Sequence, residues 1–276
     1  MKIYHVISIA IVLMLAASCS SQKADIETPG TAEWLMNQFF VNPNPPDLRE
    51  YLTGAMQQDM QPYGATVPLE VKTTYHPLQL DSTTSIWAVT SRYGEDTRDM
   101  YCYMTRGRKA WQIEAVVWSP AYDVLGEQVA QLRAINPLPD SLKVELASKE
   151  LTIASDSALG AYLLGHQQQF DSLVNLTGKY TPLQLFRERC SDPNFAVEHD
   201  SIYTKACGLL STLSIQELSR GREVCPAGTF FEVGNFLRNA VGFLWVPDGA
   251  KPPAMSFGKF YYIGKVTKNW YVYKNS

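Results

Sequence analysis

The pattern of hydrophobic and polar positions predicts helices followed by strands in the first half of the chain. Residues 31–40 and 47–60 are predicted as helices, and Asp47 with Glu50 three positions later has the form of a capping box. Four strand-like segments separated by short polar turns come next, which predicts an antiparallel meander. These segments are residues 69–80, 85–93, 99–105 and 110–118.

A break at residues 136–140, with the sequence Asn-Pro-Leu-Pro-Asp, separates this half from the next. Residues 123–135, just before the break, have the apolar spacing of a helix. After the break, alternating apolar residues in 142–153 predict one or two strands. Asp156 then opens a segment with a strong 3.6-residue apolar pattern as far as Val174, which predicts a helix.

The end of the chain is predicted to return to strands. Thr181-Pro182-Leu183-Gln184 combines an N-cap, a proline at the first helical position and a capping-box glutamine, which predicts one more helix start. Beyond it, four apolar segments rich in aromatic and β-branched residues predict strands. They are residues 229–233, 240–246, 259–263 and 270–274.

The predicted fold class is therefore α+β, with two modules that each run from helices into an antiparallel sheet. The first module is residues 32–136, with the four-stranded meander, and the second is residues 137–276. Each half ends on Lys-Xaa-Trp-Xaa followed by a β-branched residue, with the tryptophans at Trp111 and Trp270. The repeated ending suggests the hypothesis that the two modules are related.

The N-terminus has the pattern of an export signal. Residues 6–15 form an apolar run interrupted only by Ser8, and this run is too short for a helix that spans a bilayer, which needs roughly 20 apolar residues. The residues that follow, Leu-Ala-Ala-Ser-Cys at 15–19, resemble the signal of bacterial lipoproteins. The resemblance implies that residues 1–18 are a signal peptide and that acyl chains, typically palmitate, are attached to Cys19.

Two alternatives to lipidation remain open at this signal, which are ordinary secretion and a cytoplasmic location. The small residues at 16–18 also fit an ordinary signal peptidase, which would release the protein without lipid. Residues 19–31 are poor in large apolar side chains and are predicted to be a flexible tether. By analogy with enteric lipoproteins, Ser20 favours the outer membrane over the inner membrane. The sequence does not indicate whether the protein faces the periplasm or the cell surface.

Composition and charge narrow the range of partners. The chain has 276 residues, of which 46% are hydrophobic and 12% aromatic, enough for an ordinary core. Its formal net charge of −3 argues against nucleic-acid binding, which needs a concentrated basic face. The same charge argues against electrostatic adhesion to anionic lipids, so any attachment to a membrane must come from the N-terminus.

The first half also resembles a known fold. Its helices and curved meander, closed by the strand Trp-Gln-Ile-Glu-Ala-Val at residues 111–116, resemble the cone fold of the nuclear transport factor two superfamily. The resemblance covers roughly residues 31–120 and implies a pocket at the mouth of the cone without a defined chemistry.

Four cysteines remain after Cys19, in a location that permits disulfides. Cys102 lies in a strand of aromatic residues and is predicted to be a buried small hydrophobe. Cys190, Cys207 and Cys225 leave two alternatives open, one with no disulfide and one with a Cys190–Cys207 bridge.

No cofactor or metal site is predicted from the remaining side chains. His166 lies on the apolar stripe of its helix, which predicts a partly buried histidine with one hydrogen bond. His76 is predicted to be a surface residue. The pair His199-Asp200 would need further ligands from elsewhere to hold a metal and is interpreted as a solvated turn. The aromatic segment 243–262 is interpreted as core, with a sugar-binding surface as the alternative.

Several Asp-Ser-Xaa tripeptides resemble the O-glycosylation acceptor of exported proteins in one large group of gut and oral bacteria. A glycan needs an exposed site, which favours Ser82, Ser141 and Ser201 as possible O-glycosylation sites. Asp and Ser are also common at turns and helix starts, which is the alternative explanation of these tripeptides.

Three classes of function remain open. An envelope lipoprotein that binds a ligand or protein partner and has no enzymatic activity is favoured, because no nucleophile–base pair, phosphate loop or metal spacing is found. An enzyme with a pocket built from distant residues would need a shifted carboxylate or histidine there. A structural component of an envelope assembly would need a large exposed apolar patch. The sequence does not identify the small-molecule, glycan or protein partner.

Overall fold

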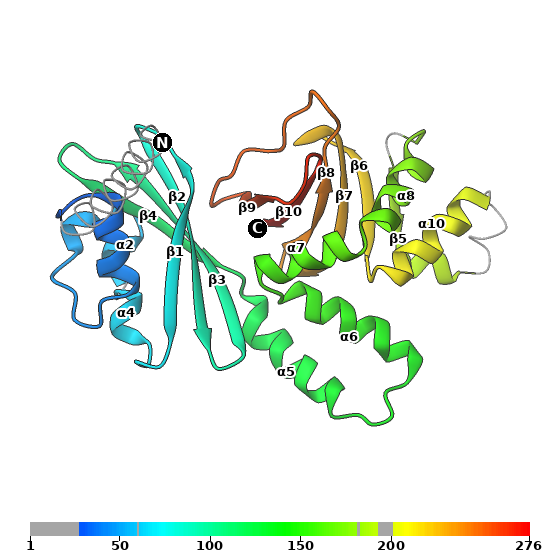
Figure 1. Ribbon diagram of the computed structural model, residues 1–276, viewed down its shortest axis with the longest axis horizontal. Coiled ribbons are helices and arrows are strands. Elements are labelled where there is room, and N and C mark those ends of the chain that lie inside the picture. Colours follow the sequence, from blue (N-terminus) through cyan, green and yellow to red (C-terminus); the bar gives the residue numbers. More distant parts are fainter. Residues whose placement is uncertain (1–27, 60, 181–182, 193–200) are drawn as a thin grey trace, which may run out of the picture. The chain divides into compact units, whose positions relative to one another are not determined.

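The computed structural model describes residues 28–59, 61–180, 183–192 and 201–276 (Figure 1). It confirms an α+β fold with antiparallel sheets and divides the chain into two compact units. The described part of the first unit is residues 28–59, 61–96 and 100–116, and the second unit holds residues 97–99 and the described residues after 116. Each unit has its own sheet and its own hydrophobic core.

The first unit contains the predicted meander, whose four strands are ordered as they follow in the chain. The strands are β1 (Lys72–Leu80), β2 (Thr84–Tyr93), β3 (Asp96–Arg106) and β4 (Trp111–Trp118). Helix α2 (Ala32–Phe40) confirms the first predicted helix and begins where the Thr31 hydroxyl accepts the backbone N–H of Trp34. The backbone N–H of Trp111 donates to the Gly30 carbonyl, so the end of the predicted tether already belongs to this unit.

The second predicted helix, residues 47–60, is wrong. The chain there forms the 3-10 turn η1 (Arg49–Tyr51) and the short helix α3 (Met56–Asp59), and the short helix α4 (Tyr63–Thr66) follows it. The Asp47 carboxylate accepts the N–H of Arg49, two residues on, and this local turn competes with a helical cap. Leu52 then bridges to Ile113, and Gly54 at φ +60° reverses the chain.

The core of the first unit lies between α2 and one face of the sheet. Leu35, Met36, Phe39 and Phe40 of the helix are almost completely buried, as is Cys102 of β3. The prediction that Cys102 is a buried small hydrophobe is therefore confirmed.

The second unit is a six-stranded sheet with helices packed on one face. Its strands are ordered β5-β6-β7-β8-β10-β9, and each neighbouring pair is antiparallel. They are β5 (Leu183–Phe186), β6 (Glu217–Arg222), β7 (Cys225–Phe236), β8 (Asn239–Trp245), β9 (Phe260–Lys265) and β10 (Trp270–Asn275). The helices are α5 (Ala121–Arg133), α6 (Asp140–Thr152), α7 (Asp156–Gly165), α8 (Gln167–Thr177), the 3-10 helix η2 (Arg187–Ser191) and α10 (Ser201–Thr212).

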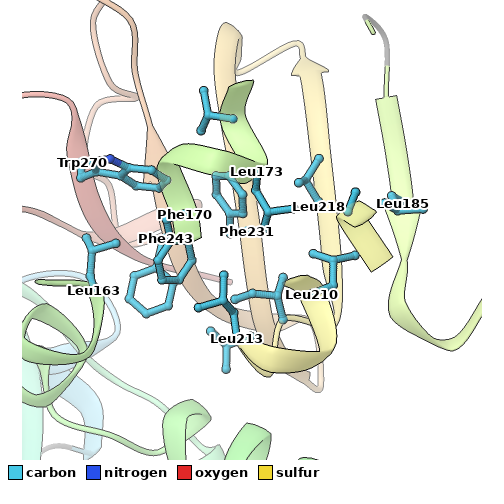
Figure 2. Packing of buried hydrophobic residues seen from close by; sticks show 14 of the residues in the cluster. Leu163, Phe170, Leu173, Leu185, Leu210, Leu213, Leu218, Phe231, Phe243 and Trp270 are labelled. Carbon is cyan, nitrogen blue, oxygen red and sulfur yellow. The ribbon is translucent and has the colours of Figure 1, made fainter. Parts of the chain in front are cut away.

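Large side chains from three helices fill the space between helices and sheet (Figure 2). Leu163 of α7, Phe170 of α8 and Leu210 of α10 are completely buried. Phe170 makes edge contacts with Phe231 and Trp270 of the sheet, at ring-centroid distances of 5.6 Å and 5.4 Å. The single predicted helix from Asp156 to Val174 is thus two helices, α7 and α8, that supply one continuous core.

The unit boundary lies at residues 116 and 117, earlier than the predicted boundary at 136 and 137. Helix α5 belongs to the second unit because it packs on α6, and the pair is held by an Arg133–Glu150 ion pair of 2.8 Å. The Asn-Pro-Leu-Pro-Asp segment, with a cis peptide bond before Pro137, is the loop of this helical hairpin. Proline and asparagine marked a turn between helices, which the sequence alone does not distinguish from a domain linker.

The predicted strands in residues 142–153 are wrong, because this segment is helix α6. The helix turns two polar residues, Ser148 and Thr152, toward the sheet. The Ser148 hydroxyl donates to the Val233 carbonyl at 2.7 Å, and Thr152 lies so close to Gly234 that any side chain there would collide with it. A helix whose most buried face is polar has no apolar periodicity to reveal it.

The last part of the chain mixes confirmed and wrong predictions. All four predicted C-terminal strands exist, as β7, β8, β9 and β10, and Trp111 and Trp270 each begin the final strand of their sheet. The predicted helix start at 181–184 is wrong where it can be tested, because Leu183 begins strand β5 and residues 181 and 182 lie outside the described residues. Strand β6 and helix α10 were not predicted.

Candidate functional site

A cavity of about 620 Å³ opens at one end of the second unit's sheet. Cavities of roughly 300–1,000 Å³ are typical of small-molecule sites. Helix α6, the junction of β5 with η2, helix α10 and strands β6 and β7 all contribute to its wall. The lining residues are Val144, Glu145, Phe186, Arg187, Glu188, Ser211, Gln216, Glu217 and Glu232.

Strand register brings the two innermost acids together. Glu217 on β6 is paired directly with Glu232 on β7, and Phe186 of β5 lies on the other side of Glu217. The row continues through Gly242 of β8 to Tyr273 of β10. Because directly paired residues point to the same face of a sheet, both carboxylates lie on the face opposite the helices. Leu218 and Phe231, their chain neighbours, face the helical core.

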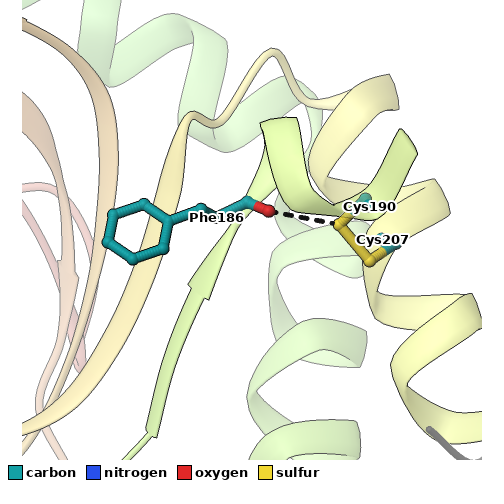
Figure 3. The surroundings of a disulfide bond; sticks show 3 residues. All are labelled: Phe186, Cys190 and Cys207. Atoms are coloured by element: carbon teal, nitrogen blue, oxygen red, sulfur yellow. Dashed lines mark hydrogen bonds between the residues drawn. A yellow bond between two sulfur atoms is a disulfide. The ribbon is translucent and has the colours of Figure 1, made fainter. Parts of the chain in front are cut away.

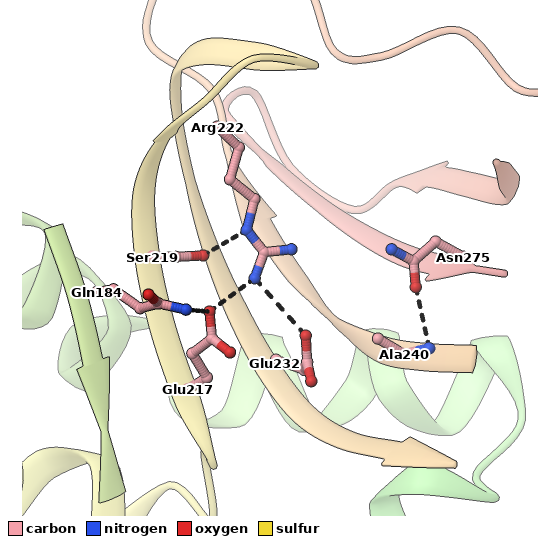
Figure 4. Close-up of polar contacts among 7 residues, drawn as sticks. All are labelled: Gln184, Glu217, Ser219, Arg222, Glu232, Ala240 and Asn275. Carbon is pink, nitrogen blue, oxygen red and sulfur yellow. Dashed lines mark hydrogen bonds and ion pairs between the residues drawn. The ribbon is translucent and has the colours of Figure 1, made fainter. Parts of the chain in front are cut away.

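Arg222 lies between the two carboxylates (Figure 4). Its Nη2 is 2.9 Å from Glu217 Oε1 and 3.6 Å from Glu232 Oε2, while its Nε donates to the Ser219 hydroxyl at 2.6 Å. The guanidinium also covers the ring of Phe230, 4.8 Å from the centroid. The two glutamate side chains are only 13% and 10% exposed, so one cation neutralises two nearly buried anions.

This arrangement affects the protonation of Glu232. Burial raises the pKa of Glu232 and the charge of Glu217 raises it further, while Arg222 and a hydrogen bond from Asn235 oppose the shift. Tyr273, completely buried, has a hydroxyl that forms no hydrogen bond with the described residues. Burial and the charges of Glu232 and Glu217 raise the pKa of this phenol above its usual range. The site therefore has more negative charge than its own arginine balances.

A second arginine reaches the cavity wall from η2. The backbone N–H of Arg187 donates to the Gln216 carbonyl, which fixes Arg187 beside the β6 end of the row. Its Nη1 is buried, yet no described residue accepts a hydrogen bond from it. Burial lowers the pKa of Arg187, although its pKa starts so high that the guanidinium stays charged. A buried cationic donor without an acceptor is costly unless a ligand or water supplies one.

A disulfide holds this part of the wall in place. The structure joins Cys190 of η2 to Cys207 of α10, with Cα atoms 5.5 Å apart, which is the bridged one of the two alternatives that the sequence left open (Figure 3). Cys190 Sγ lies 3.4 Å from the carbonyl oxygen of Phe186. The bridge thus anchors the segment that carries Phe186 and Arg187 to a helix of the core.

Replacing each acid of the pair with glutamine is expected to have opposite effects on stability. Glu217→Gln weakens the 2.9 Å contact with Arg222 and should lower the free energy of unfolding by about 1.5–3 kcal/mol. Because the pKa of Glu232 is raised in the folded state, its protonated form adds stability at low pH, and this stability is lost as the pH rises through the raised pKa. Glu232→Gln should therefore be more stable than the wild type at pH 8.

Urea unfolding at pH 4 and pH 8 measures both effects. The advantage of Glu232→Gln should shrink toward pH 4, where the wild-type carboxyl is protonated. The exposed Glu127→Gln on α5 is the matched control and should leave the free energy of unfolding unchanged at both values. If both cavity variants were equally destabilised at pH 8, the inferred imbalance of charge would be wrong.

The structure places the other candidate residues as follows. His166 is half-buried and its Nδ1 lies 2.9 Å from the Tyr162 carbonyl, and His76 is exposed, so both predictions are confirmed. Cys225 is a buried free thiol, and burial raises its pKa. Cys19 and the pair His199-Asp200 lie outside the described residues.

The predicted glycosylation sites lie at turns and helix starts. Ser82 is exposed in the β1–β2 turn, where the Asp81 carboxylate accepts the N–H groups of Thr83 and Thr84 at 2.8 and 2.7 Å. Ser141 lies in the first turn of α6, and the exposed Ser201 begins α10. Each place agrees with the structural explanation of these tripeptides, and glycosylation remains a prediction.

The aromatic segment 243–262 is mainly core, as interpreted from the sequence. Phe243 and Tyr261 are completely buried and Phe260 nearly so, whereas Trp245 and Tyr262 are partly buried and pack against the helical cluster. This segment contributes no residue to the cavity lining.

Sequence reasoning missed the cavity residues themselves. Glu217 and Glu232 alternate with core residues in their strands, a pattern that also describes the solvent-facing side of a half-exposed strand. The one available signal was Phe-Phe-Glu-Val at 230–233, where a lone acid interrupts an apolar run. Such an interruption in a buried strand indicates a paired or functional charge.

Comparisons with known proteins give no further guidance. No protein-family model matches the chain, and neither a curated protein nor a solved structure matches it. Within the described ranges, no helix is both long and apolar enough to cross a membrane. The same residues contain no group of three or more His, Cys, Asp or Glu side chains placed to hold a metal ion.

Proposed function

We propose that the protein is an exported, lipid-anchored protein of the cell envelope that binds a small cationic ligand in the cavity of its second unit. The observation that carries this proposal is the charge of the wall, which is lined by four glutamates and one arginine, Arg187. Two of these acids, Glu217 and Glu232, are almost buried and share the single cation Arg222. A ligand with a positive charge would compensate the excess.

The arrangement suits recognition better than catalysis. The raised pKa of Glu232 is what an enzyme pocket would need, but Arg222 contacts both innermost carboxylates and competes with a substrate for them. The cavity is also of ordinary size for a small ligand, and its polar groups converge from several elements of the fold. Binding of a charged ligand, the first of the three functions considered from the sequence, is therefore the function that this geometry supports.

Thermal unfolding with three matched probes tests the proposal. Butylamine, butyramide and butyrate have the same chain length and carry a positive, neutral and negative group. Only butylamine should raise the melting temperature, by about 5–10 °C at a hundredfold excess over its Kd. Glu217→Gln should abolish the shift, while the exposed Glu127→Gln should keep it. An equal shift with all three probes, or no shift with any, would contradict the proposal.

The lipid anchor is tested separately. Cys19→Ser removes the only thiol of the signal, so the variant should move completely from the detergent phase to the aqueous phase in detergent phase separation. Ser20→Ala keeps the cysteine and should partition like the wild type. A Cys19→Ser protein that still partitions into detergent would exclude lipidation at this residue. A cytosolic precursor that retains its initial methionine would exclude export altogether.

A further inference from the structure

The cavity wall carries charges of both signs at different places. The negative charge belongs to the strand row, where Glu217 and Glu232 are directly paired. The positive charge that has no partner among the described residues belongs to Arg187, which enters from η2 beyond the end of β5. Arg222 differs from Arg187, because both glutamates already engage it.

The unpartnered groups indicate what a ligand must supply. Arg187 Nη1 is a buried donor, so the ligand group next to it must be an acceptor, and a carboxylate gives the strongest hydrogen bond to a guanidinium. The Tyr273 hydroxyl is also buried and unpartnered among the described residues, but Tyr273 does not line the cavity, so it specifies no group of the ligand. The paired carboxylates of Glu217 and Glu232 favour a ligand group with a positively charged nitrogen.

We infer that the ligand is a zwitterion, an amino acid or short peptide, whose ammonium group binds at Glu217 and Glu232 and whose carboxylate binds Arg187. The inference rests on the proposed function and adds the second charge to it. Because opposite charges on one small molecule meet opposite charges on one wall, each end of the ligand is specified independently. The volume of about 620 Å³ accommodates a molecule of this size.

Isothermal titration of the purified protein with three dipeptide probes tests the inference. Diglycine carries both charges, N-acetyl-diglycine lacks the ammonium group, and diglycine amide lacks the carboxylate. Diglycine should bind at least tenfold more tightly than either blocked probe. This comparison uses only the wild-type protein, so it does not depend on the folding of any variant.

Variants then assign each charge to its residue. Arg187→Gln should weaken diglycine about tenfold and leave the affinity for diglycine amide unchanged, because that probe has no carboxylate to lose. Arg187→Lys, which keeps the charge, should bind diglycine more tightly than Arg187→Gln does. Glu217→Gln should weaken diglycine and leave N-acetyl-diglycine unchanged. The exposed Arg108→Gln and Glu127→Gln are controls and should match the wild type.

The possible failures are distinguishable. If diglycine and its amide bind equally well, Arg187 does not bind a carboxylate. The inference is then wrong, while the proposed site for a cationic ligand stands. If N-acetyl-diglycine binds as well as diglycine, Glu217 and Glu232 do not bind an ammonium group, and both proposals are wrong. If none of the three probes binds but butylamine stabilises the protein through Glu217, only the zwitterion is excluded.

Discussion

Lys274→Met is expected to lower the free energy of unfolding by about 3–5 kcal/mol, because it leaves buried carboxylates without their cation. The Lys274 side chain on β10 is only 5% exposed, and its Nζ lies 2.8 Å from Asp156 Oδ1 at the start of α7 and 3.9 Å from Asp99 Oδ2. Burial disfavours the charged lysine, but the charges of Asp156 and Asp99 outweigh burial and raise its pKa. Most of the loss therefore comes from the anions left behind.

Urea unfolding at pH 7 measures this effect, and an exposed ion pair between two loops of the same unit offers a matched control. Lys268 forms a 2.6 Å ion pair with Asp248, but the two side chains are 76% and 67% exposed. Lys268→Met should therefore leave the unfolding midpoint almost unchanged, since water solvates the remaining carboxylate. Equal losses in the two variants would show that burial of the Lys274 network does not determine its contribution.

Removal of the Cys190–Cys207 disulfide should lower the free energy of unfolding by about 3 kcal/mol, in the chain-entropy description of a closed loop of this length. The two cysteines are 17 positions apart in the sequence. The loss should be seen as a lower urea midpoint for Cys190→Ser/Cys207→Ser. Because the bridge anchors the segment with Phe186 and Arg187, the double variant should also bind diglycine more weakly than the wild type.

A reductant provides the control for this prediction. Dithiothreitol should lower the urea midpoint of the wild type to that of the double variant and have no effect on the double variant. Cys102 and Cys225, the two free cysteines of the described chain, are already thiols and do not respond. A wild-type midpoint that does not change on complete reduction, verified by alkylation and mass measurement, would show that the bridge contributes nothing to stability.

Strands β1–β4 and β7–β10 could be predicted from the sequence because their apolar side chains face a core, whereas β5 and β6 were not predicted. In β7, Phe231 and Val233 face the helices and Phe230 faces the other side, so the segment is apolar nearly throughout. The meander of the first unit likewise follows from short polar turns between apolar segments. These signals are local, which is why four strands of each predicted group are present.

Helix α6 and the unit boundary could not be predicted, because neither is marked by a pattern of apolar residues in the sequence. Ser148 and Thr152 are the buried residues of α6, and polar residues do not contribute to a hydrophobic period. The Pro-rich loop at 136–140 joins two packed helices, but it has the composition of a linker. Asp47 failed as a helix cap because its carboxylate bonds to the second following residue.

The site was beyond sequence reasoning for a different reason. Its charged residues come from α6, the β5–η2 junction, β6 and β7, and only strand register makes Glu217 the neighbour of Glu232. Their spacing of 15 positions matches no known motif and depends on the length of the β6–β7 hairpin. The disulfide was only partly predictable: the few cysteines of the second half suggest this pair, but the sequence left the absence of a bridge open as well.

Crystals of the protein soaked in diglycine test the central claim most directly, because they locate the ligand. The proposals predict density inside the cavity, with the ammonium group within hydrogen-bonding distance of Glu217 or Glu232 and the carboxylate beside Arg187. An empty cavity at diglycine concentrations that saturate the protein in solution, or density at another place on the molecule, would contradict them.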